Sequence, residues 1–372
     1  MSLPLRRRRT LTGVAAVAVG TFALSACGGG VSDTDAGTGA ASAAADFTPA
    51  TSGEMTLYTW SDYFPEELAA AFEEETGIDL TVDYYDSNET LEAKLRASNG
   101  TGYDVVVPGD YMVQILRDSD LLLEIDATSL PNGANIKESF VDPYFDEGRM
   151  YTVPYLYGTT GYMYDSAKTD TELTSWADYF NAPASLGPVG TMNDQSEVIN
   201  SALRATGGTT CTTDPDELQA AQDLLGEFKS QVSTISSEGI LDRLAGGEES
   251  IAMIWNGAGM RARADLDTLV YVYPTEGLSL WQDNFAVPVG ATNVDQALTF
   301  LNWMMEPENS AFAANFQRYG SGITGVEEFL DEEMATAPEM NLPEGYEGAQ
   351  PVEPCTNEEL TNYTQIWESF KG

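Results

Sequence analysis

Aromatic residues stand beside carboxylates at the ends of several expected strands. Trp60 ends one strand, Pro108-Gly-Asp-Tyr111 follows another, Trp255 ends a third, and Trp281-Gln-Asp283 precedes a further apolar run. Aromatic faces attract cations, and carboxylates neutralise buried ones. Ligands of open α/β sheets bind outside the carboxyl ends of the strands. The set therefore indicates a binding site, although any one of these rings alone is more often part of a hydrophobic core.

The sequence contains no histidine. Mechanisms that need an imidazole, including the Ser-His-Asp triad and the usual zinc sites, are therefore excluded. Two enzyme interpretations stay open. Gly257-Ala-Gly-Met-Arg-Ala262 matches the dinucleotide pattern G-x-G-x-x-A, but no clear acidic residue ends a strand about 20 residues further on. A glycosidase would need two carboxylates in an aromatic cleft, and no single pair stands out.

Alternating strands and helices must position these side chains. Expected strands cover about 55–60, 78–85, 103–107 and 250–255, and expected helices about 65–76, 86–99, 215–231 and 294–305. The run Asp86-Ser-Asn-Glu89 has the form of a capping box. This order predicts two α/β lobes whose strand ends face a shared cleft.

The N-terminus has the form of an export signal. Arg6 to Arg9 precede an apolar run that is too short to span a bilayer, and Leu24-Ser-Ala-Cys27 resembles a bacterial lipobox. We expect residues 1–26 to be a signal peptide, Cys27 to carry lipid, and 27–53 to be a flexible linker rich in Gly, Ala, Ser and Thr.

The chain is strongly acidic, with a formal net charge of −42. Removal of the signal takes away four arginines and no acidic residue, which makes the charge of the mature chain −46. Such a field repels nucleic acid and permits a cationic ligand, although a generally acidic surface explains most of it. Residues from about 54 onward are too many for one small core, and no later run is apolar enough to cross a membrane.

Two cysteines remain after Cys27 is assigned to lipid. Outside the cell, Cys211 and Cys355 are expected to form a disulfide, since that compartment is oxidising. Two buried free thiols are the alternative.

Seven runs resemble the spermidine/putrescine-binding proteins, the extracytoplasmic receptors of polyamine ABC importers. They cover nearly the whole mature domain in the same order. The shared runs are Leu57-Tyr-Thr-Trp-Ser-Asp-Tyr63, Tyr84-Tyr-Asp-Ser-Asn-Glu-Thr90, Ala93-Lys-Leu95, Tyr103-Asp-Val-Val-Val-Pro108, Val153-Pro-Tyr155, Met253-Ile-Trp-Asn-Gly257 and Trp281-Gln-Asp283.

The resemblance implies a two-lobed, periplasmic-binding-protein-like α/β fold, with a mixed sheet flanked by helices in each lobe and the ligand between the lobes. It also implies a set of ligand-binding aromatic, polar and acidic residues. That set is Trp60, Ser61, Asp62, Tyr63, Tyr111, Asp194, Glu197, Trp255, Trp281, Asp283, Tyr319 and Glu353. Asp62 stands where a Glu is common, Gly109 where a serine often helps, and Glu353 near the place of a family glutamine.

The chemistry of these residues suits a polyamine. Asp194 and Glu197 would hold one terminal ammonium, Asp283 an internal or intermediate one, and Asp62 the other end. Indole and phenol faces would cover the methylenes between them.

We therefore expect a monomeric, non-enzymatic receptor without cofactor or metal, anchored outside the membrane through Cys27, that passes polyamine to an ABC permease. Lobe one would comprise 54–157 and about 288–323, and lobe two 158–283 and about 324–372. Agmatine, a cationic amino acid or betaine is the alternative ligand, and a carbohydrate-active lipoprotein is a more distant alternative.

Overall fold

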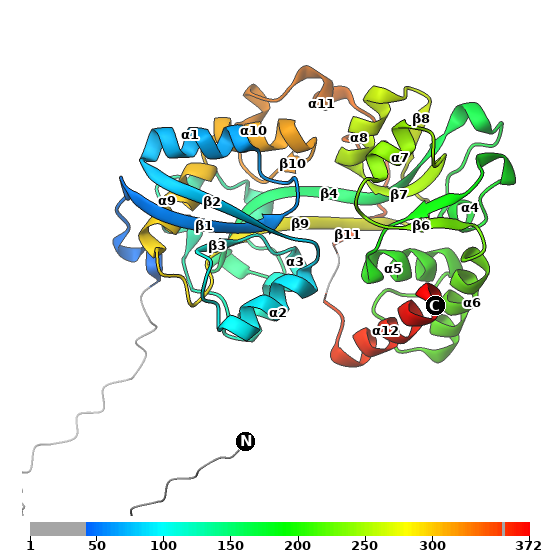
Figure 1. Cartoon of the computed structure of the whole chain (residues 1–372), viewed down its shortest axis with the longest axis horizontal. Coiled ribbons are helices and arrows are strands. Elements are labelled where there is room, and N and C mark those ends of the chain that lie inside the picture. Colours follow the sequence, from blue (N-terminus) through cyan, green and yellow to red (C-terminus); the bar gives the residue numbers. More distant parts are fainter. Residues whose placement is uncertain (1–41, 352–353) are drawn as a thin grey trace, which may run out of the picture. The chain divides into compact units, whose positions relative to one another are not determined.

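A computed structural model describes residues 42–351 and 354–372. Its strands form one eleven-stranded sheet, which Figure 1 shows running through the middle of this part of the chain. The strands are β1 Gly53–Trp60, β2 Ile78–Tyr85, β3 Val105–Val106, β4 Thr152–Asp165, β5 Val189–Thr191, β6 Val232–Ile235, β7 Ile251–Trp255, β8 Leu269–Val272, β9 Leu278–Ala286, β10 Gly320–Ser321 and β11 Ala349–Pro351.

The sheet is mixed, as predicted. Its main order is β2-β1-β3-β9-β4-β7-β5-β6, while β8 and β10 pair with β4, and β11 pairs with β9. At one end β1 is parallel to β2 and β3, and at the other β5 is parallel to β6 and β7. The long strands β4 and β9 run antiparallel to each other between these ends, with an irregular register between Pro154 and Tyr157. They are therefore common to both halves of the sheet.

Helices cover the sheet in both halves (Figure 1). The α-helices are α1 Glu66–Thr76, α2 Asn88–Ser98, α3 Asp110–Asp118, α4 Trp176–Phe180, α5 Gln195–Thr206, α6 Pro215–Phe228, α7 Ile240–Ala245, α8 Asn256–Asp265, α9 Val294–Met304, α10 Pro307–Gln317, α11 Glu332–Thr336 and α12 Asn357–Lys371. Each of the four predicted helices and four predicted strands occurs, with ends shifted by up to three residues.

The start of α2 differs from its prediction. Ser87, not Asp86, is the N-cap, and its hydroxyl accepts a hydrogen bond from Thr90 N at 3.1 Å. Asp86 instead accepts from the Thr90 hydroxyl at 2.9 Å. The capping-box interpretation was wrong by one residue, because Ser and Asp are both good caps and stand side by side.

The hydrophobic core is divided along the sheet. Leu57 and Val105 belong to one cluster and their neighbours Tyr58 and Val106 to another, because successive strand residues point to opposite faces. Both clusters belong to the half that contains β1 to β3. A third cluster, around β5, β7, α5, α6 and α12, fills the other half.

The predicted disulfide is present. Cys211, between α5 and α6, is bonded to Cys355, just before α12, with a Cα–Cα distance of 5.1 Å. Within the described residues, no helix has both the length and the hydropathy that a membrane span requires. The exact lobe boundaries, 54–157 with about 288–323 and 158–283 with about 324–372, stay a prediction.

Candidate ligand-binding site

Asp283 lies inside β9, and its side chain is partly buried. Trp281, Asp283 and the start of the apolar run that follows them belong to one strand, because β9 begins at Leu278 and continues to Ala286. Asp283 Oδ2 accepts a hydrogen bond from Tyr63 OH at 2.7 Å. Burial raises the pKa of Asp283 to about 7, and the Tyr63 bond opposes this rise. Among the described residues, no lysine or arginine forms an ion pair with Asp283.

Aromatic rings gather around this carboxylate. The ring centroids of Trp281 and Tyr319 lie 4.9 Å apart, edge to face, and the Tyr63 ring lies 6.3 Å from Tyr319 and 5.2 Å from Tyr155. The indole nitrogen of Trp281 is buried and has no hydrogen-bond partner. Three of the predicted aromatic residues therefore adjoin the predicted acid.

Trp60, Tyr111 and Trp255 are partly exposed. Trp60 Nε1 donates to Val107 O at 3.0 Å, and its ring lies 4.8 Å from that of Tyr85. Trp255 ends β7 and packs against a core cluster of each half of the sheet. Trp255 thus lies at the boundary between the two halves, whereas Trp60 and Tyr111 pack against clusters of the half that contains β1 to β3.

A hydrogen-bond network joins α2 to the first turn of α3. Asn88 Oδ1 accepts from Gly109 N at 3.1 Å, and Asn88 Nδ2 donates to Tyr111 OH at 3.1 Å. Tyr111 OH donates to Glu89 Oε1 at 3.2 Å. Gly109 in turn pairs as an isolated β-bridge with Asp283. Glu89 is therefore connected to the candidate site, although the sequence analysis did not select it.

Asp194 and Glu197 stand at the start of α5 and interact, but they have different surroundings. Asp194 is the N-cap, and its Oδ1 accepts from Glu197 N at 2.9 Å. Burial, together with the charge of Glu197, raises the pKa of Asp194 to about 6. The predicted convergence of both side chains on one ammonium therefore stays a hypothesis.

Glu197 is buried, and its Oε1 accepts from the Thr160 hydroxyl at 3.0 Å. Its Oε2 has no partner at normal hydrogen-bond distance. Burial raises the pKa of Glu197, while Ser279, Arg204 and Thr160 act to lower it.

Asp110 is a second acid that the sequence analysis did not select. It is buried at the start of α3, and its Oδ1 accepts from Tyr111 N at 2.8 Å. Burial raises the pKa of Asp110 well above its usual value, and the charges of Asp283 and Glu197 add to this rise. Its position in Pro108-Gly-Asp-Tyr111, directly before a predicted aromatic residue, is the signal that could have identified it.

Ser61 and Asp62 are exposed. The Asp62 backbone carbonyl accepts from the Gln317 amide, and its side chain makes no hydrogen bond or ion pair with the described residues. A Cβ added at Gly109 would lie 3.0 Å from Asn88 Nδ2 and 3.5 Å from Asp283 Oδ1. The first distance is shorter than an ordinary Cβ contact, so the serine that the resemblance implies at this position would require Asn88 to shift slightly. Cys27 and Glu353 lie outside the described residues.

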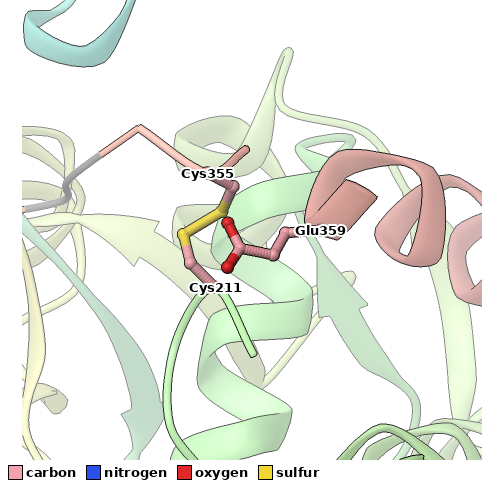
Figure 2. Close-up of side chains that lie close together, drawn as sticks. All are labelled: Cys211, Cys355 and Glu359. Carbon is pink, nitrogen blue, oxygen red and sulfur yellow. A yellow bond between two sulfur atoms is a disulfide. The ribbon is translucent and has the colours of Figure 1, made fainter. Parts of the chain in front are cut away.

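Figure 2 shows the Glu359 carboxylate beside the disulfide. The candidate ligand atoms of Cys211, Cys355 and Glu359 lie within 4.8 Å of one another. Sulfur atoms bonded to each other offer no thiolate, and thiolate is the form of cysteine that binds metals. We assign no metal site to these residues.

Two cavities lie away from the site. One, of about 470 Å³, is lined by residues including Asp83, Lys94 and Tyr103, and the other, of about 240 Å³, by residues including Glu75 and Trp303. Neither lining contains a predicted ligand-binding residue. The charges and rings around Asp283, rather than these volumes, therefore identify the candidate site.

Comparison with known proteins agrees with the resemblance found in the sequence. Residues 67–341, more than half of the chain, match the family model described as bacterial extracellular solute-binding protein. The chain is 32% identical over 280 residues to the spermidine/putrescine-binding periplasmic protein of Escherichia coli (strain K12). The aligned residues cover 75% of this chain and 80% of that protein.

Solved structures agree with the fold. A putative spermidine/putrescine ABC transporter protein from Listeria monocytogenes superposes with a TM-score of 0.80 at 29% identity, covering 86% of this chain and 98% of the other. A lipoprotein of Treponema pallidum gives a TM-score of 0.75 at 25% identity, covering 85% and 99%. The predicted fold class is therefore confirmed.

Proposed function

This chain belongs to the spermidine/putrescine-binding protein family of bacterial extracellular solute-binding proteins, and from that premise we propose that it binds a linear polyamine and delivers it to an ABC importer. The family is one of transport receptors and not of enzymes, which confirms the expectation that the chain catalyses nothing.

The observation that carries the proposal is the state of Asp283. A buried carboxylate is costly unless a cation or several donors compensate it. Asp283 receives one hydrogen bond, from Tyr63, and no ion pair from the described residues. An ammonium group would supply the missing charge, and Trp281 and Tyr319 would cover the methylenes attached to it.

The other acids favour a ligand with more than one positive charge. Burial raises the pKa values of Asp110, Asp194 and Glu197, and neighbouring negative charges add to the rise for Asp110 and Asp194. A betaine would bring its own carboxylate into this negative surrounding. A polyamine brings separated ammonium groups joined by apolar carbon, which matches both kinds of side chain.

We also propose that Cys27 is lipidated and holds the receptor on the outer face of the cell membrane. Leu24-Ser-Ala-Cys27 supports this, and one structural relative is itself a lipoprotein. Wild-type protein made in a bacterial host should partition into the detergent phase, whereas Cys27→Ala should stay in the aqueous phase. Equal partitioning of both proteins would contradict lipidation.

A thermal-shift screen tests the function directly. The screen would compare putrescine, cadaverine, spermidine, spermine and agmatine with betaine and maltose. A ligand at 100 times its dissociation constant should stabilise the protein by about 2.7 kcal/mol. We expect this shift for one or more polyamines and for neither betaine nor maltose. A stabilising shift with maltose alone, or the absence of a shift with every amine tested, would reject the proposed function.

A further inference from the structure

The dipeptide Asn256-Gly257 begins α8, directly after Trp255 of the candidate site. The Asn256 side chain is buried and forms hydrogen bonds with two distant parts of the chain. Its Oδ1 accepts from Thr159 N of β4 at 3.0 Å, and its Nδ2 donates to Glu339 O at 3.2 Å. The amide therefore fixes the start of α8, and with it the end of β7, relative to both segments.

The carbonyl that Asn256 binds is itself held in place. Tyr273 OH donates to Glu339 O at 2.6 Å. The Glu339 carboxylate is buried and accepts from Arg263 Nη2 at 2.8 Å. Because Arg263 also belongs to α8, the segment around Glu339 contacts this helix at two places and gives Asn256 a fixed acceptor.

Gly158 shows how Asn256 affects the position of Trp281. Gly158 pairs with Trp281 across β4 and β9. A Cβ added at Gly158 would lie 2.4 Å from Asn256 Oδ1 and 2.5 Å from Trp281 Cζ2. The amide and the indole therefore occupy the same space above Gly158, and the amide limits where the indole can lie.

Gly257 allows Tyr319 to pack closely against α8. A Cβ added at Gly257 would lie 2.5 Å from both Arg318 O and Tyr319 Cε1. Gly257 has no positive φ, so alanine would suit its helical backbone, and lack of space alone requires glycine. The Tyr319 ring in turn contacts Trp281 edge to face at 4.9 Å. This glycine of the G-x-G-x-x-A pattern therefore has a packing reason.

We propose that Asn256 and Gly257 are positioning residues of the candidate site, which together set the places of the Trp255, Trp281 and Tyr319 rings. Asn256 acts on both indoles, and Gly257 acts on the phenol. This inference rests on the proposed function. Its consequence is that both residues control affinity for the ligand through the rings, since cation–π attraction and contact with methylenes both depend on where the rings lie.

Gly257→Ala tests the contact with Tyr319. The added methyl group must displace the Tyr319 ring or the end of α10. We expect calorimetric titration with putrescine and spermidine to show an affinity at least about tenfold lower than that of the wild type. The near-ultraviolet circular dichroism of the empty protein, which reports the packing of aromatic rings, should also change.

Gly226→Ala is the matched control for this variant. Gly226 is an exposed residue of α6, and a Cβ added there would meet nothing within 4 Å. The same substitution should therefore leave both the amine affinity and the near-ultraviolet spectrum unchanged.

Asn256→Ala tests the amide and separates positioning from general stability. Its control is Asn302→Ala, because Asn302 of α9 also joins distant segments by accepting from Asn132 N at 2.9 Å. Asn302 lines the cavity of about 240 Å³, which contains no predicted ligand-binding residue. Both variants should lower the free energy of unfolding, since each loses a tertiary hydrogen bond. Under conditions in which both are folded, Asn256→Ala alone should weaken amine binding.

Unchanged affinity in folded Asn256→Ala or Gly257→Ala, or an equal loss in either variant and its control, would overturn the inference. The two substitutions act at separate contacts, so that either folded variant is decisive. Failure of the wild type to bind any amine would instead reject the proposed function. The spectra of the empty proteins would still test the ring positions, and an unchanged spectrum of Gly257→Ala would contradict them.

Discussion

Replacing Asp283 with asparagine should weaken spermidine binding by about 2–5 kcal/mol, the usual cost of leaving a buried charge unpaired. Asparagine preserves the size of the side chain and can still accept the hydrogen bond from Tyr63. The loss would therefore report the missing charge and not a rearranged core. Isothermal titration calorimetry measures it, with Asp267→Asn, an exposed position, as the control.

The pH dependence of the same titration separates charge from packing. Below pH 7 the empty protein increasingly holds a proton on Asp283, which a bound ammonium must displace, while the amine itself stays charged. Wild-type affinity should therefore fall about tenfold per pH unit below 7. In Asp283→Asn this step should vanish, while the contributions of the other acids with raised pKa values, such as Asp194 near pH 6, should remain. An unchanged profile or an unchanged affinity would remove Asp283 from the site.

The groups that face Asp283 allow this assignment. Four tyrosines whose pKa values are affected by the charge of Asp283 all have pKa values above the usual one, so they stay neutral below pH 7. They are Tyr63, Tyr85, Tyr155 and Tyr319. Asp110 is the other carboxyl whose pKa the charge of Asp283 affects.

The effect of pH on folding stability is opposite in direction to its effect on ligand binding. A carboxyl with a raised pKa binds its proton more readily in the native state, so its contribution to the stability of the empty protein increases as pH falls from about 7 to about 4.

Loss of the disulfide should lower the free energy of unfolding by roughly 4–5 kcal/mol, the entropic value for a closed loop of this length. The bond joins positions 144 residues apart and holds α12 against α5 and α6. Tyr363 of α12 supports the same contact, since its hydroxyl donates to Asn200 Oδ1 at 2.6 Å and accepts from Cys211 N at 2.8 Å. Denaturant unfolding of a Cys211→Ser, Cys355→Ser double variant measures the change.

Ligand affinity provides the internal control for this variant. The disulfide lies beside Glu359 (Figure 2) and joins the segment between α5 and α6 to the start of α12, whereas Asp283 belongs to β9. The dissociation constant for spermidine should therefore be nearly unchanged where the variant is folded. Equal unfolding free energies for the variant and the oxidised wild type would show that the bridge does not stabilise the native state.

Local sequence patterns predicted the helices and strands whose ends are marked by residues such as proline and glycine. Pro65 and Gly77 bound α1 as expected, and Gly77 adopts the positive φ of 73° that glycine tolerates best at a helix end. The strand β4 was not predicted. All but one of its residues are buried, so it lacks the alternation of polar and apolar side chains by which half-buried strands are recognised.

The candidate site was predictable only where family-like runs marked it. Tyr63, Trp281 and Asp283 come together as the resemblance implies, from segments far apart in the chain. Asp62 was predicted as a ligand-binding acid from its charge and its place in the resemblance. Its side chain is exposed and makes no hydrogen bond or ion pair with the described residues.

The sharing of β4 and β9 limits how this protein can be divided for experiments. A fragment that ended before β7 would leave open edges on both sides of β4, since β7 lies on one side and β8 and β9 lie on the other. Such an open edge is a template for pairing with other copies. Neither half is therefore suitable for separate expression, and the intact chain is the smallest practical unit of study.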